Sequence, residues 1–406
     1  MQAPHSSKSI TGSKGHELAG KRVCLGITGS VAAARSPELA RELMRHGAEV
    51  FCVMSRSAQE LVGPQLMHWA TGNPVVTGLT GECEHISLCG DHSGKADLLL
   101  IAPCTANTIG KIAWGIDDTP VTTCASTALG AKIPIVIVPA MHQSIYDNPF
   151  VGENLASLGR KGVHLVMPRL GEGKAKIAEN ADIVDYCIRA VSKQALKGKK
   201  VLVTAGATRE FMDDVRFISN PSSGRMGIAL AREAWLRGAE VTLVSGHIDV
   251  PAPGYLKHVE VVGAAEMLEA VRKEAKGADF IALSAAVGDF TAKKEDGKLG
   301  SGRGGLRLSL ATAPKISDSA RKWNPKAKLV LFKAESGVSD KELRGKAEEK
   351  MRKCGADLIV ANDVSRKGAG FGTETNEVLI IARKGKAEKV KGAKAEIAVK
   401  ILDAIS

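Results

Sequence analysis

The stretch Val201–Gly227, VLVTAGATREFMDDVRFISNPSSGRMG, constrains the fold of this chain more than any other segment. Its β-branched start, Val201–Thr204, runs into an Ala-Gly pair and so predicts a buried strand entering a tight turn. A loop then leads to Pro221–Gly227 and the apolar run Ile228–Ala231, which predicts the start of a helix. Free backbone N–H groups at such an N-terminus attract anions. An α/β unit with an anion site is therefore expected to begin in mid-chain.

A similar opening, Val23–Ala34, lies near the start of the sequence. Lys21–Ile27 is expected to be a strand, and the turn after it leads into a helix that continues over Arg35–His46. Ala48–Met54 is the next expected strand, which completes a βαβ unit of the doubly wound kind. Gly29 is the only loop glycine, so the dinucleotide fingerprint GxGxxG is missing. A phosphate site at this turn and a plain tight turn both remain open.

Further apolar runs predict the rest of two parallel sheets. Asp97–Ala102 and Ile133–Val138 resemble central parallel strands, and a helix over Ala178–Ala195 is expected to close the first half. The fold class expected is α/β, with two doubly wound, Rossmann-like parallel-sheet domains in tandem, joined near Leu196. The expected boundaries are a polar extension over 1–20 and domains over 21–196 and 197–406. In the second domain, the later strands are expected at Glu240–Val244, Asp279–Leu283, Lys328–Phe332 and Asp357–Ala361, and a terminal hairpin at Val378–Ala382 and Glu388–Val390.

The composition excludes several classes of protein. No run approaches the roughly 18 apolar residues that a membrane helix needs. The first twenty residues lack the apolar core of a secretory signal. The eight cysteines include no CxxC pair, which favours reduced thiols in a cytoplasmic protein over a disulfide framework or structural zinc.

The net charge of +12 allows three interpretations. A basic surface can bind nucleic acid, but only 4% of the residues are aromatic, which leaves few stacking platforms for bases. The late lysines, in Lys341–Lys353 and Lys384–Lys400, are better explained as a solvated surface. The charge can also serve small anionic substrates, which the strand-end motifs favour. The Gly- and Lys-rich stretch Lys293–Gly305 is either a mobile loop beside a site or a surface loop without function.

The motifs at the strand ends also resemble known families. In the first half, these are Gly26–Ala33, His85–Leu88, Pro103–Asn107 and Pro139–His142, which together resemble the flavin-dependent cysteine decarboxylases. In the second half, a set of five resembles phosphopantothenate–cysteine ligase: Thr204–Thr208, Ile218–Gly227, Ser284–Phe290, Gly297–Leu299 and Ala361–Ser365. Both sets in one chain, over residues 21 to 401, resemble the bifunctional enzymes of coenzyme A synthesis. The resemblance implies a flavodoxin-like flavoprotein half followed by a ligase half.

For the first half, the resemblance implies FMN, with the substrate thiol oxidised to a thioaldehyde so that CO₂ is lost β to a C=S group. His85 matches the histidine that the family needs, and a base with an ordinary pKa can handle the thiol proton at neutral pH. Asn107, Met141 and His142 match substrate positions. The implied contacts to the FMN phosphate are Gly29, Ser30, Val31 and Ser55, and those to its ring are Pro103, Thr105, Ala106, Asn107 and Thr123.

Two positions depart from the decarboxylase pattern. His142 stands where the family often has Asn, and its ring can still donate a hydrogen bond to a carboxylate. The substrate flap, Met167–Ile177, has no cysteine, although many members use one there as a proton donor. Another acid or water must then supply that proton. Arg169, Lys174 and Lys176 can still attract an anionic substrate.

For the second half, the resemblance implies that 4′-phosphopantothenate attacks the α-phosphate of CTP, after which the amine of cysteine displaces CMP from the acyl-cytidylate. Lys298 matches the lysine that stabilises phosphoryl charge, and Asn220 matches the residue that holds the acyl intermediate. Taken alone, a solvated lysine and a turn asparagine explain these two residues as well. Gly224 is expected at a phosphate, and Mg²⁺ is expected with the triphosphate. Further implied contacts are Ser284, Ala285, Asp289, Ala313, Pro314, Lys315, Ile316, Phe332, Lys350 and Lys353.

The resemblance also implies trimeric packing of flavin domains and dimeric packing of ligase domains. Two other functions remain open from the residues. One is a two-domain nicotinamide-dependent reductase, which the missing GxGxxG disfavours, and the other is a basic nucleic-acid-binding protein.

Overall fold

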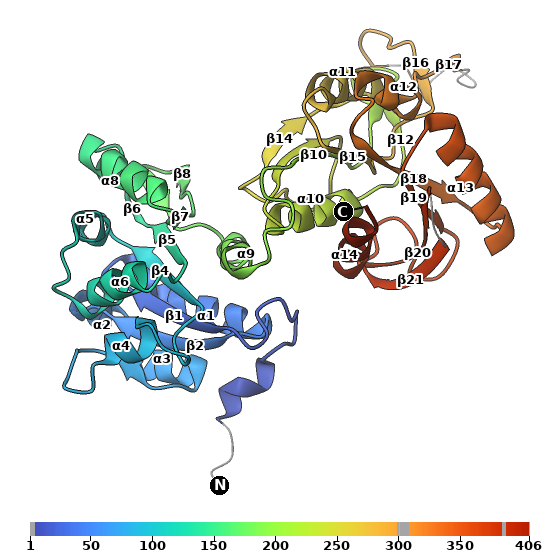
Figure 1. Cartoon of the computed structure of the whole chain (residues 1–406). Coiled ribbons are helices and arrows are strands. Elements are labelled where there is room, and N and C mark those ends of the chain that lie inside the picture. The colour runs from blue at the N-terminus through green and yellow to red at the C-terminus, as the bar shows by residue number, and fades with distance from the viewer. Residues whose placement is uncertain (1–4, 299, 301–307, 384–386, 406) are drawn as a thin grey trace. The chain divides into compact units, whose positions relative to one another are not determined.

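The computed structural model describes residues 5–298, 300, 308–383 and 387–405 of the chain (Figure 1). The chain divides into two compact units, Met1–Ser192 and Lys193–Ser406. None of the helices within the described ranges combines the length and the apolarity needed to cross a bilayer.

The first unit is built on a six-stranded sheet in which every pair of neighbours is parallel. Its strand order is β3-β2-β1-β4-β5-β7, so the chain starts in the middle, builds one side and then crosses to the other. In sheets of this kind, ligands bind where the direction changes, here at the carboxyl ends of β1 and β4. The strands are β1 (Arg22–Ile27), β2 (Glu49–Met54), β3 (Val75–Val76), β4 (Leu98–Cys104), β5 (Ile135–Pro139) and β7 (His164–Leu165).

Helices cover both faces of this sheet, which explains why all seven residues of β4 are buried. Helices α4, α5, α6 and α8 share one apolar core on one face, and α1, α3 and α9 contact one another or the sheet elsewhere. The expected helix over Arg35–His46 is a 3-10 turn followed by α1, and the helix expected over Ala178–Ala195 is the shorter α9. The bounds are η2 (Val31–Arg35), α1 (Ser36–Arg45), α2 (Arg56–Leu61), α3 (Pro64–Thr71), α4 (Glu84–Cys89), α5 (Ala106–Trp114), α6 (Pro120–Gly130), α7 (Gln143–Tyr146), α8 (Pro149–Arg160) and α9 (Asn180–Val191).

The polar N-terminal segment packs onto the first unit. It contains a short 3-10 helix, η1 (Ser6–Ile10), and the fully buried side chain of Leu18. The N–H of Gly12 donates to the carbonyl oxygen of Met44 over 3.0 Å, and the N–H of Leu18 donates to that of His46 over 2.9 Å. This segment therefore covers the C-terminal end of α1.

The second unit is built on an eight-stranded, mainly parallel sheet in the order β14-β13-β10-β15-β18-β19-β20-β21. It also starts at a central strand, β10, and the expected terminal hairpin extends it as two antiparallel strands. The expected α/β class is confirmed, and the second sheet is mixed rather than purely parallel. The strands are β10 (Lys200–Ala205), β13 (Glu240–Ser245), β14 (Lys257–Glu260), β15 (Phe280–Leu283), β18 (Lys328–Glu335), β19 (Leu358–Asp363), β20 (Thr375–Ala382) and β21 (Ala387–Ala393).

Helices and two small hairpins complete the second unit. Helices α11, α12 and α13 share an apolar core with the sheet, while α10 packs on β10, β13 and α14. Hairpins β11/β12 and β16/β17 project from the loops after β10 and β15. The bounds are α10 (Arg225–Leu236), α11 (Ala264–Ala275), α12 (Ile316–Trp323), α13 (Asp340–Cys354), α14 (Lys394–Ile405), β11 (Arg209–Phe211), β12 (Phe217–Ser219), β16 (Phe290–Ala292) and β17 (Leu310–Thr312).

Candidate active sites

At the carboxyl edge of the first sheet, three strands lead directly into helix N-termini. Ser30 caps η2 after β1, Ser55 caps α2 after β2 and Thr105 caps α5 after β4, each accepting a backbone N–H with its hydroxyl oxygen. The remaining free N–H groups of these first turns point to the same edge because the strands are parallel. The edge therefore offers hydrogen-bond donors for an anion, and the sequence predicted all three residues.

Thr28 joins the ends of β1 and β4. Its hydroxyl donates to the carbonyl oxygen of Pro103 over 2.9 Å and accepts the N–H of Thr105 over 3.0 Å. A Cβ atom on Gly29 would lie 2.5 Å from Cβ of Ser57, so only glycine fits in this turn. Thr28 thus fixes the turn at Gly29 relative to Pro103 and Thr105 at the carboxyl edge of the sheet.

Two predicted residues have exposed side chains at this edge. Val31, in the first turn of η2, is 83% exposed, and Asn107 is exposed in the first turn of α5 beside the half-buried Ala106. An apolar side chain left open beside polar helix ends suits a ligand with a flat apolar ring and a phosphate.

His85 and Thr123 lie on two neighbouring helices, α4 and α6. Nδ1 of His85 is buried and, among the described residues, has no hydrogen-bond partner. A buried ring nitrogen without a partner is costly, so it fits a group that binds a ligand. The Thr123 hydroxyl donates to the carbonyl oxygens of Asp117 and Thr119 over 2.9 and 3.0 Å.

The segment predicted to be a substrate flap forms a small sheet with the segment that follows β5. Strand β6 (Met141–His142) pairs with β9 (Lys174–Lys176), which in turn pairs with β8 (Arg169–Gly171). Met141 therefore lies opposite Ala175, and the exposed His142 lies opposite Lys174. Arg169 forms an ion pair with Glu179, and Lys176 pairs with Glu172 over 2.6 Å. The flap is thus adjacent to the two predicted substrate residues.

In the second unit, a crevice of about 740 Å³ opens at the carboxyl ends of β10, β15 and β18. It is bordered by the N-terminus of α10 on one side and by a face of α13 on the other. Most of the predicted ligase residues line it: Asn220, Gly224, Ser284, Ala285, Asp289, Pro314, Lys315, Ile316, Phe332, Lys350 and Lys353.

The α10 end of the crevice presents free backbone donors. Gly224, at the N-cap of α10, has φ of +76° and no side chain caps the helix. A Cβ atom there would also lie 2.4 Å from Cγ2 of Ile248, so glycine is required. The amide of Asn220 donates to the carbonyl oxygens of Ala286 and Val287 over 3.2 and 3.4 Å, which fixes its orientation in the crevice.

The α13 end of the crevice is lined by lysines. Lys350 donates to the carbonyl oxygen of Phe332 over 3.1 Å, and burial lowers the pKa of its ammonium group. Lys353 pairs with Asp318 over 3.0 Å. The sequence did not single out Lys346, which lines the crevice one helical turn before Lys350 and pairs with Glu335 over 2.8 Å. Lys346 and Lys350 are four residues apart and so share one helix face, and this spacing could have revealed Lys346 from the sequence.

Two further cations line the crevice near α10, and sequence reasoning missed both. Lys394, the first residue of α14, donates to the carbonyl oxygen of Thr373, and burial followed by the nearby Arg225 charge lowers its pKa. Nε of Arg225 is buried and, within the described part of the chain, has no hydrogen-bond partner. Arg225 could have been found from its place beside Gly224. The position of Lys394, far along the chain, gave no such signal.

Two predicted ligase residues do not line the crevice. Ala313 is buried, and its N–H donates to the carbonyl oxygen of Asp289 over 2.9 Å. Lys298 is exposed on the segment after β16, where the side chain of Asp214 accepts the N–H of Gly297 over 2.9 Å. The neighbouring Leu299 and residues 301–307 lie outside the described residues, so the loop expected over Lys293–Gly305 is described only in part.

Comparison with known proteins gives family matches for both units. The family described as "Flavoprotein" matches residues 11–192, and the family described as "DNA/pantothenate metabolism flavoprotein C-terminal domain" matches residues 196–406. In part of its length, the chain is also 30% identical to a solved structure described as "The FMN binding protein AtHal3", covering 41% of this chain and 94% of that one with a TM-score of 0.34.

Two curated relatives match over nearly the whole length. The "Coenzyme A biosynthesis bifunctional protein CoaBC" of Thermococcus kodakarensis is 48% identical over 405 residues, covering 99% of this chain and 98% of the relative. The protein of the same name from Methanocaldococcus jannaschii is 38% identical over 403 residues, covering 99% and 97%. These matches confirm the resemblance inferred from the motifs and support neither the reductase nor the nucleic-acid-binding alternative. The chain belongs to the CoaBC family of bifunctional proteins of coenzyme A biosynthesis.

Proposed function

We propose that this chain carries out two consecutive steps of coenzyme A synthesis. The second unit ligates cysteine to 4′-phosphopantothenate at the expense of CTP, and the first decarboxylates the resulting 4′-phosphopantothenoylcysteine to 4′-phosphopantetheine. The observation that carries this proposal is the family match over both units, combined with a separate strand-end site in each. Both sites offer backbone N–H donors at helix N-termini, as phosphorylated ligands require.

In the ligase crevice, the substrate carboxylate attacks the α-phosphate of CTP and pyrophosphate leaves. Three lysines lie along one face of α13 in the crevice: Lys346, Lys350 and Lys353. Their positive charges stabilise the negative charge that develops on pyrophosphate as it leaves. Asn220, held by two carbonyl oxygens, orients the acyl group while the amine of cysteine displaces CMP. The role of Lys298 at the same phosphoryl group rests on the family resemblance alone, because this residue does not line the crevice.

This crevice would hold Mg²⁺ together with the triphosphate. Among the described residues, no three carboxylates or imidazoles come close enough together to hold a metal ion by themselves. Asp289, Glu335 and Glu349 line the crevice separately and offer the oxygen atoms that Mg²⁺ prefers. Because Mg²⁺ usually keeps several water ligands and needs only one or two protein carboxylates, a crevice with separate carboxylates would fit it.

In the decarboxylase site, the helix ends at Ser30, Ser55 and Thr105 and the exposed Val31 fit FMN, the cofactor named in the description of a similar structure. Bound FMN supplies the reversible oxidation of the substrate thiol. His85 takes up the thiol proton at its unpartnered Nδ1. Asn107 and His142 hold the substrate carboxylate by hydrogen bonds, and the flap covers it to exclude water.

A product assay tests both halves at once. Purified protein is given CTP, Mg²⁺, 4′-phosphopantothenate and cysteine, and pyrophosphate, CMP and the pantetheine product are measured. We expect stoichiometric release of pyrophosphate and CMP and a yellow protein that forms 4′-phosphopantetheine. No pyrophosphate release would refute the ligase assignment, and absence of flavin binding after reconstitution with FMN would refute the decarboxylase assignment.

A His85→Asn variant then tests the decarboxylase mechanism. We expect it to bind FMN and to make 4′-phosphopantothenoylcysteine at the normal rate, but to lose decarboxylation by about 100-fold or more, as expected for removal of a general base. An unchanged rate of CO₂ release would remove His85 from the mechanism.

We also infer that the protein self-associates in the cytoplasm. In the first unit, Trp114 and Phe150 are 78% and 71% exposed, and large exposed aromatic side chains are enriched at interfaces. All eight cysteines are free thiols, which suits a reducing compartment. The family resemblance leads us to expect trimeric flavin domains and dimeric ligase domains. Light scattering on the whole chain measures the mass, and a monomer would contradict this inference.

A further inference from the structure

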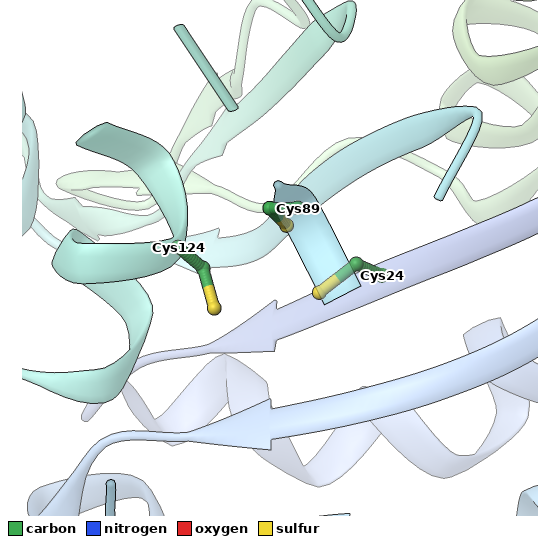
Figure 2. Close-up of side chains that lie close together, drawn as sticks. All are labelled: Cys24, Cys89 and Cys124. Carbon is green, nitrogen blue, oxygen red and sulfur yellow. The ribbon is translucent and has the colours of Figure 1, made fainter. Parts of the chain in front are cut away.

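Three cysteines from separate parts of the sequence meet inside the first unit (Figure 2). Cys24 is on the central strand β1, Cys89 is the last residue of α4 and Cys124 is on α6. Their side chains are at most 1% exposed, and their Sγ atoms all lie within 4.8 Å of one another. Figure 2 shows the sulfur atoms facing a common region from the strand and the two helices. We call these residues the thiol cluster.

The thiol cluster lies in an apolar core, and the charges of His85 and Glu84 on helix α4 act on Cys124. The cluster belongs to the core on one face of the sheet, among side chains such as Ile101 and Val121. Cys104 lies in the same core but is not part of the cluster. Within the described ranges, no imidazole or carboxylate joins the three sulfur atoms as a fourth ligand.

The spacing of the sulfur atoms suits a single metal ion. With metal–sulfur bonds of about 2.3 Å, three ligands in a plane around an ion stand about 4.0 Å apart. The three sulfur atoms lie within 4.8 Å of one another, so each pair must approach by less than about 1 Å to bind one ion. Small side-chain rotations are enough for this movement.

The chemistry of the cluster selects the ion. Thiolates favour soft ions such as Cu(I) and Zn²⁺, whereas Zn²⁺ in proteins almost always takes four ligands. A dry, three-sulfur site lacks the fourth ligand, and Cu(I) is stable with two or three sulfur atoms. We propose that Cys24, Cys89 and Cys124 form a buried binding site for Cu(I), separate from the flavin and nucleotide sites.

Binding of Cu(I) to the thiol cluster needs no oxidant or reductant. One Cu(I) ion displaces two thiol protons, which leave to solvent, and forms two Cu–S bonds to the resulting thiolates. The third sulfur coordinates as a neutral thiol, and no electron is transferred. The complex carries one negative charge, whereas full deprotonation would leave two in an apolar core, where charge is costly.

Cu(I) in the thiol cluster would link the helices that carry the decarboxylase residues. His85 precedes Cys89 by about one turn of α4, and Thr123 is the neighbour of Cys124 on α6. An ion held by both helices stabilises their pairing, so we expect a higher Tm. It also restricts any adjustment of His85, so we expect slower decarboxylation at unchanged ligase activity.

Competition with a chromophoric Cu(I) chelator tests the site. The full-length flavoprotein carries Cys83→Ser, which removes the one exposed thiol, and is titrated anaerobically with Cu(I). We expect one tightly held equivalent per chain. We expect each of three substitutions, Cys24→Ala, Cys89→Ala and Cys124→Ala, to lower the affinity for Cu(I) by more than about 100-fold. Substituting residues that only hydrogen-bond to metal ligands already lowers metal affinity by about 10- to 100-fold. The matched control Cys104→Ala is expected to bind normally. Affinity unchanged by all three cluster variants would overturn the proposal.

X-ray absorption on the parent protein supplies a test that does not depend on the variants folding. We expect two or three sulfur neighbours at about 2.3 Å and no nitrogen or oxygen neighbour. Nitrogen or oxygen ligands would overturn the proposal, as would the absence of a tightly bound equivalent. The flavin spectrum of each variant shows whether its first unit is folded, and where it is not, the absorption result decides.

Discussion

Lys350 shows how a residue placed for function weakens the folded state. Its ammonium group is partly buried in the crevice, and this burial lowers its pKa because the charged form loses hydration, with the charges of Lys333 and Lys315 acting in the same direction. A lowered lysine pKa destabilises the fold at every pH below that pKa, and the penalty disappears as the pH rises towards the ordinary value of 10.5. At neutral pH, the nucleotide-free protein therefore carries a penalty from Lys350, which a bound triphosphate relieves.

We accordingly expect Lys350→Met to raise the free energy of unfolding of the nucleotide-free protein by about 1 kcal/mol, within the usual range for a stabilising substitution. The same variant should lose ligase activity. Chemical denaturation at pH 7, with and without CTP, measures both effects. A variant less stable than the parent would contradict the argument, and Lys341→Met, on the exposed start of α13, is the control.

Asp363, at the end of β19, has the opposite effect on stability. Its carboxylate accepts hydrogen bonds from the Ser365 hydroxyl and from the N–H groups of Ser365, Gly337 and Val338, and these lower its pKa from 3.8 to about 2. A lowered carboxyl pKa stabilises the fold above pH 3.8, and that contribution is lost as the pH falls through about 2.

Asp363→Asn should therefore be less stable than the parent at pH 7, and the difference should shrink as the pH falls from about 4 towards 2. Thermal unfolding of both proteins across this range measures the effect. A difference that stays constant with pH would show that the charge of Asp363 contributes nothing. Asp403→Asn, on the exposed face of α14, serves as a control for the loss of one surface carboxylate.

At the scale of elements, the approach of α10 to β10 determines the shape of the crevice. A Cβ atom on Gly227 would lie 2.6 Å from Cβ of Ala205, 2.7 Å from Oγ of Ser284 and 2.8 Å from the carbonyl oxygen of Thr204. The helix can therefore rest on the strand end only where residue 227 has no side chain. Since Gly224 and Ser284 line the crevice on either side, this contact sets its width.

Gly227→Ala is expected to lower the free energy of unfolding by about 1–3 kcal/mol, as overpacking does, and to raise the KM for CTP by displacing the start of α10. The matched control is Gly345→Ala on the exposed face of α13, where an added Cβ meets nothing within 4 Å. That change should stabilise the protein by about 0.5–1 kcal/mol, because alanine favours a helix over glycine. Denaturation and steady-state kinetics compare the two, and equal effects would refute the packing argument.

At the scale of the molecule, each unit contains its own sheet, core and site. We expect a chain divided between Ser192 and Lys193 to give two folded proteins, because each unit has its own sheet and its own apolar core. The 1–192 piece should bind FMN and the 193–406 piece should release pyrophosphate from CTP. Far-ultraviolet circular dichroism and the two assays check this. An unfolded piece would show that the units depend on each other for stability.

The sequence predicted the fold because central parallel strands are continuous apolar runs, as in β4, and their ends are marked by Ser30, Thr105 or Gly224. Most of the crevice residues came instead from the family resemblance, matched position by position. Sequence reasoning missed Lys394, since nothing local links this lysine to Arg225. It also treated the cysteines as scattered, because only the folded chain brings Cys24, Cys89 and Cys124 together. Contacts between distant segments have no periodic signal, so they are read from the structure alone.

Strand β21 is the last member of the eight-stranded sheet, so no strand among the described residues pairs with its outer backbone groups. Unpaired strand edges can recruit strands from other molecules and lead to aggregation, and lysines on such edges prevent it. Lys389 and Lys391 are both on β21, and Lys389 forms ion pairs with Asp340 and Glu377 over 3.0 Å. Replacing these lysines with threonine would leave an uncharged edge strand of high β-propensity. We expect the concentrated protein to form insoluble oligomers as a consequence.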